Sequence, residues 1–192
     1  ESDLDAAGAQ RLLEEMRRAG VTLDPTLALV SLTCRRATED PHLRYVRREL
    51  RQVWEMRGQA AGERPALDSA VAERGRRACG EYVRRYHAMG GRVVAGTDVG
   101  AVPYLVPGFS LHGEMRMLAE AGLSNHDVLR AATIEAAHAL RIDAETGSIE
   151  AGKAADLVVL EANPLDDIKN VGSIREVIRE GRRYRPAELL GS

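Results

Sequence analysis

One carboxylate occupies a position where a parallel α/β protein could perform chemistry. Asp98 is the polar last residue of the β-prone run that begins at Arg92, and a loop rich in glycine and proline follows from Val99 to Gly108. In such folds, catalytic residues sit beyond the carboxyl ends of strands. A carboxylate there can hold a divalent cation or move a proton. Alternatively, Asp98 only shapes a turn, as aspartate often does before glycine.

Further candidates lie close to Asp98 in the sequence. Pro103 and Tyr104 belong to the loop after Asp98, and because such loops often line pockets, both are candidates for substrate binding. His112 opens the helix expected after this loop, where it could contact a substrate or simply pack the loop. Three further histidines have no partner at the spacing of metal ligands, and we interpret them as surface or packing residues: His87, His126 and His138. His42 follows Pro41 at a helix start, and we expect it to be exposed.

The composition excludes several classes of protein. Hydrophobic residues make up 44% of the 192 residues and the formal net charge is −2, which argues against intrinsic disorder. No apolar run approaches the roughly 18 residues of a membrane helix. Residues 44–51 carry four arginines that could contact nucleic acid, but Glu49 and Glu55 are interleaved, which is typical of a solvated helix face. We therefore expect neither a nucleic-acid partner nor a membrane.

The cysteines and the first residue bear on the cellular setting. Cys34 and Cys79 are too few for a disulfide framework, which favours a reducing compartment and a cytoplasmic protein. The chain begins with Glu1 rather than with methionine, so we expect a processed product or a piece of a longer protein, and the targeting of the parent cannot be judged from this sequence.

Hydrophobic periodicity predicts two regions of different character. In the first, over residues 1–141, helices are expected at 8–19, 41–57, 66–89, 110–121 and 125–140, with short strands at 21–23 and 92–98. Ser124, followed by Asp127, predicts a capped helix start. In the second, over residues 142–192, glycines separate short strands expected at 148–149, 156–160, 174–178 and 182–184. The pattern indicates an α/β part followed by a small β-rich module.

Several short motifs occur along the chain in a specific order. They are Val93–Asp98, Pro107–Gly108, Leu111–Met115, Ala121–Ser124, Ala131–Thr133, Gly147–Leu160, Asn163–Leu165 and Val177–Arg182. In this order and spacing they resemble the metal-dependent amidohydrolase superfamily, in the branch of imidazolonepropionase-like and Xaa-Pro dipeptidase (prolidase)-like enzymes. Gly20-Val21 with Pro25–Leu27 resembles the seventh strand of that branch, so the resemblance spans nearly the whole chain.

The resemblance implies an α/β fold, namely the C-terminal portion of a (β/α)8 TIM barrel plus part of a small β-sandwich domain. It also implies hydrolysis of amide and related C–N bonds with one or two divalent metal ions, zinc being the metal expected. In that family the metal lowers the pKa of a bound water, which makes hydroxide available near neutral pH. The aspartate at the end of the eighth strand takes a proton from that water and often contacts a metal. Asp98 matches this position.

The sequence departs from the family pattern in its metal ligands. None of the five histidines forms the His-x-His pair of the first strand or matches the histidines after strands five and six. Lys153 and Lys169 match neither the bridging lysine nor its place near the fourth strand. A catalytic zinc site needs about three protein ligands, and two strands cannot close a barrel. We therefore expect the chain to begin after the sixth strand and to be inactive alone.

Two hypotheses follow. In the first, the chain is part of a metal-dependent hydrolase of a dipeptide-like or N-acyl amino acid substrate. Asp98 is then metal ligand and general base, and Pro103, Tyr104 and His112 contact the substrate. The missing ligands would come from the N-terminal half of the barrel or from a homo-oligomer. In the second, the chain is a non-catalytic structural fragment that assembles with a partner chain, because its open strand edges would otherwise invite aggregation.

Overall fold

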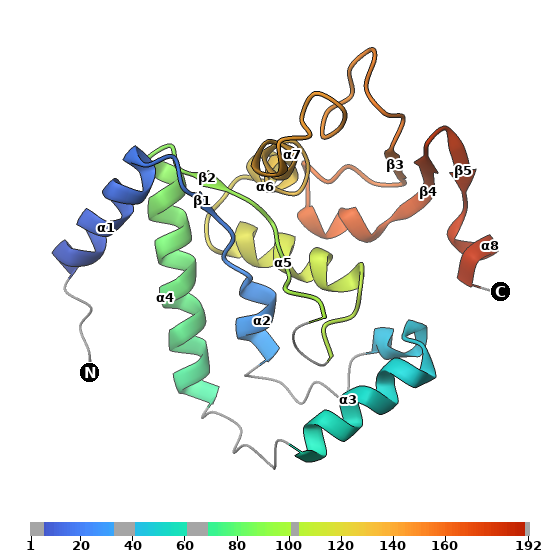
Figure 1. The fold of residues 1–192 in the computed structure, drawn as a ribbon, viewed down its shortest axis with the longest axis horizontal. Coiled ribbons are helices and arrows are strands. Elements are labelled where there is room, and N and C mark those ends of the chain that lie inside the picture. Colours follow the sequence, from blue (N-terminus) through green and yellow to red (C-terminus); the bar gives the residue numbers. More distant parts are fainter. Residues whose placement is uncertain (1–5, 33–40, 61–68, 101–103, 191–192) are drawn as a thin grey trace.

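Two short strands lie side by side although they are far apart in the sequence. In a computed structural model, which describes residues 6–32, 41–60, 69–100 and 104–190, β1 (Thr22–Leu23) pairs with β2 (Arg92–Val93) in parallel. The Val94 N–H extends the ladder by donating to the Leu23 carbonyl at 3.0 Å. Because the strands are parallel, their carboxyl ends point the same way, and the segments that follow them leave from the same side (Figure 1).

Each of these strands follows a helix and a left-handed glycine. α1 (Ala6–Arg18) leads to β1 through Gly20, and α4 (Ser69–Ala88) leads to β2 through Gly90. The second of these turns is tightly packed, because a Cβ atom added at Gly91 would lie 2.5 Å from the buried ring of Tyr86. The Tyr86 hydroxyl in turn donates to the Val21 carbonyl at 2.5 Å, which ties α4 to the start of β1. Strand pairing and helix packing therefore fix one another.

The main hydrophobic core lies between the helices that follow the two strands and α4. These helices are α2 (Leu27–Leu32), after β1, and α5 (Phe109–Glu120), after β2; both contact α4. The most deeply buried apolar side chains of this core are Leu27, Val83, Tyr86, Leu118 and Val128. The expected helix–strand alternation of an α/β protein is confirmed, although β2 is shorter than the predicted strand at 92–98.

The segment between α2 and α4 forms a second, smaller core. Its elements are a 3-10 turn, η2 (Pro41–Tyr45), and a helix, α3 (Arg48–Ala60), where the sequence predicted one helix over 41–57. The prediction of a continuous helix was wrong because the Val46 N–H closes a 3-10 turn onto Leu43. The break changes which residues are covered: Val46 and Trp54 are buried, whereas Leu50 and Val53 are 39% exposed. Val106 completes this second core.

A second predicted helix is also divided. Residues 125–140 form α6 (Asn125–Ala131) and α7 (Ile134–Leu140), and Thr133 between them has non-helical φ and ψ of −130° and −96°. The Thr133 hydroxyl donates to the Leu129 carbonyl at 2.7 Å, in competition with the backbone ladder. The predicted start of α6 is confirmed, since the Ser124 hydroxyl accepts from the Asp127 N–H at 3.1 Å.

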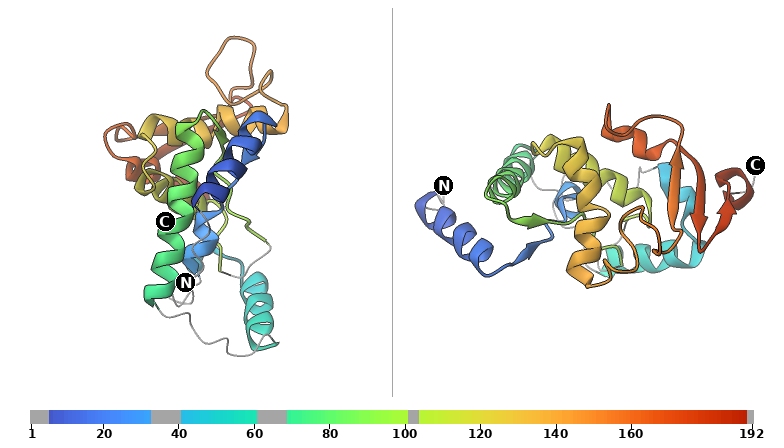
Figure 2. Two further views of the ribbon diagram at one scale, coloured as in Figure 1. Left: turned by 90° about the vertical axis from the view of Figure 1, so that its left-hand side faces the viewer. Right: turned by 90° about the horizontal axis from the view of Figure 1, so that it is seen from above.

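The C-terminal residues form a three-stranded antiparallel sheet in the order β3-β4-β5 (Figure 2). Its strands are β3 (Leu157–Leu160), β4 (Ile174–Arg179) and β5 (Arg182–Tyr184), and α8 (Pro186–Leu190) contacts β4. A 3-10 turn, η3 (Ile168–Gly172), packs on α5, and its Ile168 and Val171 side chains join the main core. The sheet is thereby attached to the α/β part.

The strand predicted at 148–149 is absent from the structure. Ser148 lies in a bend and Ile149 has no regular secondary structure, and Ile149 is 87% exposed. Lys153 instead closes the turn by donating from Nζ to the Ser148 hydroxyl at 2.6 Å. Among the helices of the described ranges, none combines the length and the apolar character needed to cross a membrane.

Candidate active site at the carboxyl ends of β1 and β2

Asp98 lies in the segment that leaves the carboxyl end of β2, on the exposed surface of the described chain. Its backbone is left-handed, with φ of 55°. Thr26, in the segment after β1, has φ of 45°, and Tyr104, beyond Asp98, has φ of 70°. Non-glycine residues rarely adopt this conformation, and those that do are concentrated at functional sites. The two segments that follow the paired strands therefore share this unusual backbone feature.

A second carboxylate stands beside the backbone that carries Asp98. Asp24 directly follows β1, and a Cβ atom added at Gly96 would lie 2.0 Å from its Oδ2 atom. The Asp24 side chain thus rests on Gly96, two residues before Asp98, and any larger residue at position 96 would displace it. Sequence reasoning did not single out Asp24. The strand predicted just before Asp24 could have indicated a site residue there. Only the parallel pairing of β1 with β2, however, shows that Asp24 lies beside the residues that follow β2.

A third carboxylate, Glu114, lies beneath this surface on α5 and is fully buried. The Ala28 N–H donates to its Oε2 at 2.6 Å, and Oε1 has no hydrogen-bond partner among the described residues. Burial raises the pKa of Glu114 from 4.5 to about 7; the N–H groups of Ala28 and Leu27 oppose this rise, and the charge of Asp24 adds to it. The motif Leu111–Met115 contains Glu114, yet nothing in its sequence context marked it as buried.

His112 is half-buried and lies at the edge of an aromatic cluster. Its ring meets that of Phe109 edge-on at 6.2 Å, and His42 stacks on Phe109 at 4.1 Å. Burial lowers the pKa of His112, and the nearby charge of His42 lowers it further. The neutral imidazole, which can donate and accept a hydrogen bond, is therefore favoured near neutral pH. His42, interpreted from the sequence as an exposed residue, is instead part of this stack.

Tyr104 lies next to the same aromatic cluster. Its ring lies 5.6 Å from that of the buried Trp54, and it packs on the second core together with Phe109. Tyr104 and His112 thus both border the η2–α3 segment, whereas Asp98 is on the exposed surface. η2 and α3 lie on the side of the molecule toward which β1 and β2 point (Figure 1). Pro103, the other predicted substrate-binding residue, lies outside the described residues, as does Cys34.

The donor set found here does not fit a complete metal centre. Within the residues that the structure describes, no three side chains of histidine, cysteine, aspartate or glutamate are placed to hold one ion. Asp98 could supply one oxygen ligand, but a catalytic zinc ion requires about three protein ligands. The side chains in the described ranges therefore do not by themselves form a complete metal centre.

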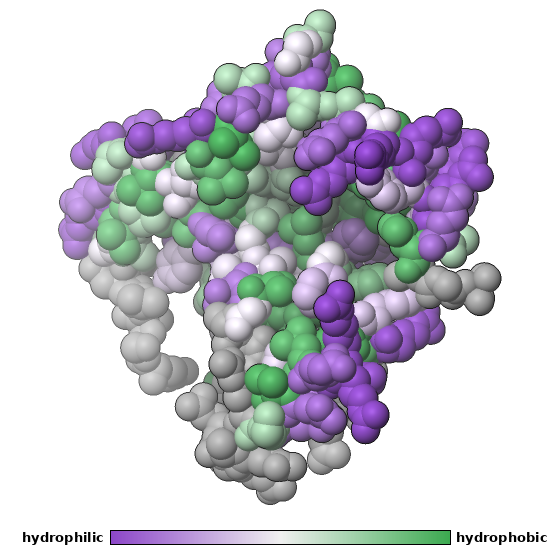
Figure 3. Space-filling view, turned by 45° about the vertical axis from the view of Figure 1, so that its right-hand side comes forward, coloured by the Kyte–Doolittle hydropathy of each residue, from purple (hydrophilic) through white to green (hydrophobic). Residues whose placement is uncertain are grey.

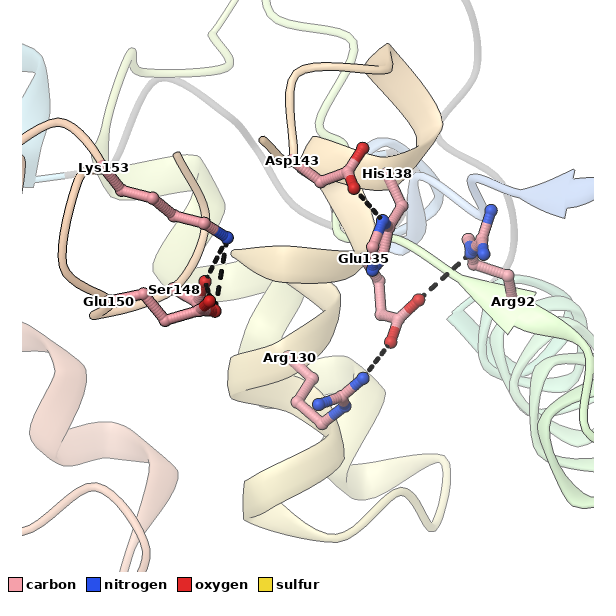
Figure 4. A network of polar contacts seen from close by, with 8 residues as sticks. All are labelled: Arg92, Arg130, Glu135, His138, Asp143, Ser148, Glu150 and Lys153. Carbon is pink, nitrogen blue, oxygen red and sulfur yellow. Dashed lines mark hydrogen bonds and ion pairs between the residues drawn. The ribbon is translucent and has the colours of Figure 1, made fainter. Parts of the chain in front are cut away.

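A separate polar network occupies the opposite, amino-terminal end of β2 (Figure 4). Arg92, which begins β2, donates to Glu135 at 3.0 Å, and Arg130 reaches the other oxygen of the same carboxylate. His138 pairs with Asp143 at 3.0 Å a turn further along. Because Glu135 joins Arg92 of β2 to Arg130 of α6, we interpret the network as a structural link between β2 and the α6–α7 pair.

Comparison with known proteins places the chain in a family. The model of the amidohydrolase family matches residues 1–183, and the chain belongs to that family. It is 32% identical over 109 residues to the imidazolonepropionase of Symbiobacterium thermophilum, covering 52% of this chain and 24% of that protein. This confirms the family suggested by the sequence motifs. The chain spans about a quarter of the length of this curated relative.

Solved structures are similar to most of the chain. A protein of Bifidobacterium longum assigned as a prolidase superposes with a TM-score of 0.62 at 31% identity, covering 85% of this chain and 35% of that one. The bottromycin amidohydrolase superposes with a TM-score of 0.66 at 28% identity, covering 97% of this chain and 43% of that one. The mixed α/β arrangement therefore matches part of the amidohydrolase fold, and each of these proteins is much longer than this chain.

The buried carboxyl group predicts a specific pH dependence of stability. The folded chain binds more protons than the unfolded chain between pH 4.5 and about 7, because the pKa of Glu114 is raised on folding. Its contribution to the free energy of unfolding should therefore fall as pH rises through this window, by up to about 1.4 kcal/mol per pH unit. Urea unfolding of the wild type and of Glu114→Gln at pH 5, 6 and 7 measures this slope.

The control for that measurement is Glu120→Gln, on the exposed surface of the same helix. We expect Glu114→Gln to flatten the profile and Glu120→Gln to leave its slope unchanged. Asp24 is the charged neighbour that acts on Glu114, so Asp24→Asn should shift the steep part of the profile to lower pH. Parallel profiles for the wild type and Glu114→Gln would show that Glu114 is not buried as described.

Proposed function

We propose that this chain contributes to a metal-dependent amide hydrolase and that Asp98 acts in its active site. The observation that carries this proposal is the position of Asp98 beyond the carboxyl end of β2, in a chain that belongs to the amidohydrolase family. The parallel neighbour β1 ends at the same side and brings Asp24 there. Catalytic groups of α/β enzymes gather at such an edge.

The architecture proposed for the whole enzyme is a (β/α)8 barrel, in which β1 and β2 would be the last two strands. Residues 1–141 would belong to the barrel, and residues 142–192, including β3–β5, to a composite β-sandwich. Two observations support this: the β1–β2 pairing is parallel with a helix after each strand, and the relatives of known structure are more than twice as long as this chain. Residues outside this chain would supply the other strands.

In this proposal the Asp98 carboxylate takes a proton from the attacking water and returns it to the leaving nitrogen, as a general base followed by a general acid. It would also be one ligand of a divalent ion, zinc by the chemistry of such sites, whose other ligands lie outside this chain. Its exposed position supports both roles, because a group buried within this chain could not reach residues supplied from elsewhere.

The proposed substrate is a dipeptide-like or N-acyl amino acid molecule. The similarity to a protein assigned as a prolidase supports this choice, and so does the family's name for its activity, amide hydrolysis. Tyr104, Pro103 and His112 are proposed to lie on the substrate side. For Tyr104 and His112 the support is their place on the border of η2 and α3, beyond the carboxyl ends of β1 and β2.

Removal of the proposed base should abolish turnover without unfolding the protein. In the complete catalytic unit, Asp98→Asn should reduce hydrolysis of a dipeptide panel by about 10²- to 10⁴-fold, the usual contribution of a positioned acid–base group. Because Asp98 is exposed, the melting temperature should change little. Asp166→Asn, at an exposed position in the C-terminal module, is the matched control and should retain full activity. Activity of Asp98→Asn close to the wild type would refute the proposal.

A second candidate function is that of a structural fragment that assembles with a partner chain. One observation favours assembly in particular: in the described chain, β1 and β2 form a sheet of only two strands, and so short a parallel sheet is marginal without further strands. Large hydrophobic side chains also lie on the surface, among charged ones on the face shown in Figure 3. The most exposed are Met56, Leu140, Ile149 and Leu189.

Light scattering coupled to size-exclusion chromatography tests this assembly. At micromolar concentration, the purified chain should elute as a dimer or larger species, or with a second polypeptide, because the open edges of β1 and β2 would pair. Dilution should dissociate a self-assembled species. A stable monomer over the whole concentration range would contradict both the homo-oligomer and the partner chain as requirements for folding.

A further inference from the structure

Glu114 is a charged residue type among the buried and otherwise apolar residues of α5. The other buried residues of this helix are Met115, Met117 and Leu118, and the exposure of Glu114 itself is 0%. A carboxyl group loses its hydration on burial, and native proteins normally compensate with hydrogen bonds to both oxygens. Here Oε2 has the Ala28 N–H at 2.6 Å, whereas Oε1 has no hydrogen-bond partner among the described residues. So costly an arrangement requires an explanation.

The hydrogen bond of Glu114 connects two parts of the chain that diverge after the paired strands. Ala28 is in the first turn of α2, which follows β1, whereas Glu114 is in α5, which follows β2 and the segment of Asp98. The backbone pairing of the sheet ends with the bond from Val94 to Leu23. Beyond that point, the Glu114–Ala28 bond is a direct side-chain link between the two segments.

A second contact lies between that link and the strands. Asp24 rests on Gly96, so residues 24–28 are held at one end by Gly96 and at the other by Glu114. Between these two points, Thr26 has the left-handed φ of 45°. This conformation is sterically strained for a β-branched residue, so the segment would relax if its contact with Gly96 or with Glu114 were lost. Asp98 is two residues from Gly96 and would lose its support.

We infer that Glu114 is a positioning residue, whose carboxyl group holds residues 24–28 against Gly96 and thereby fixes the backbone that presents Asp98. Only the catalytic consequence of this role rests on the function proposed for Asp98. The positioning itself depends on contacts within this chain. Glutamate is suited to it because its side chain reaches the Ala28 N–H from α5. A glutamine retains the accepting oxygen and should replace it, whereas an alanine removes the hydrogen bond between Glu114 and the Ala28 N–H.

Nuclear magnetic resonance of the 192-residue chain tests this positioning. In Glu114→Ala, amide exchange at Leu27 and Ala28 should accelerate roughly tenfold or more, as expected for the loss of a buried hydrogen bond. The amide signals of Gly96, Thr97 and Asp98 should shift. Amides in β4, such as that of Val177, should exchange as in the wild type. Glu114→Gln should restore the wild-type pattern in both segments.

The outcomes separate local positioning from general stability. Uniform acceleration that includes β4, or unchanged signals at residues 96–98 in Glu114→Ala, would overturn the inference. If Glu114→Ala does not fold, Glu114→Asp takes its place, since the shorter side chain keeps the carboxyl group but not its reach. The same local changes are then expected, and their absence would overturn the inference equally.

Kinetics in the complete catalytic unit give the functional readout. Glu114→Ala should lower kcat by about tenfold or more with KM nearly unchanged, because the group displaced acts on the reacting bond. The kcat of Glu114→Gln should stay within about threefold of the wild-type value. If the charge of Glu114 were what mattered, this neutral variant would lose activity as Glu114→Ala does. If Asp98→Asn proves active while residues 24–28 and 96–98 respond to Glu114→Ala, the proposed function fails but the positioning stands. If Asp98→Asn is inactive but residues 24–28 and 96–98 do not respond to Glu114→Ala, the positioning fails and the proposed function stands.

Discussion

The parallel pairing of β1 with β2 is the constraint on which the rest of the structure depends. The two strands are short, yet they bring together segments separated by α2, α3 and α4. The tight packing of Gly91 on Tyr86 and the bond from Tyr86 to Val21 keep the strands in register. Only because the strands run in the same direction do Asp24 and Asp98 leave from one side. The candidate site is thus a consequence of strand direction rather than of neighbouring sequence.

Two unfavourable features occur beyond the ends of these strands, although Arg141 and Glu180 elsewhere in the chain also have a left-handed backbone. One is the buried carboxyl group of Glu114; the other is the left-handed backbone at Thr26, Asp98 and Tyr104. Each destabilises the folded state, and the apolar core between α2, α4 and α5 must offset both. Proteins tolerate such features where they fix a group needed for function. Glu114 and Thr26 belong to the contacts that connect residues 24–28 with Gly96, two residues before Asp98.

The sequence was informative where the signal was local. The cap at Ser124 and the strands predicted at 156–160, 174–178 and 182–184 needed only neighbouring residues, and the structure contains each of them. Of the strand predicted at 92–98, only Arg92–Val93 is a strand. The helix breaks at Val46 and Thr133 were missed because each depends on one hydrogen bond that periodicity does not reveal. The predicted strand at 148–149 failed because nothing in the described structure pairs with it.

The site could be predicted only in part for the same reason. Asp98 was identified from the end of a strand, but Asp24 and Glu114 became visible only through contacts with Gly96 and Ala28, which are distant in sequence. Tyr104 and His112 were expected near a substrate, and the structure adds that their rings pack with Trp54 and Phe109. Their role toward a substrate stays a prediction, as does that of Pro103.

We propose that this chain supplies Asp98 to a metal centre whose other ligands come from elsewhere. Elemental analysis of zinc after exhaustive dialysis tests it most directly, with the 192-residue chain compared to the complete catalytic unit. The chain alone should retain no stoichiometric zinc, because one carboxylate is too few ligands. The complete unit should retain about one or two ions, fewer when it carries Asp98→Asn. One tightly bound zinc ion on the chain alone would contradict the claim.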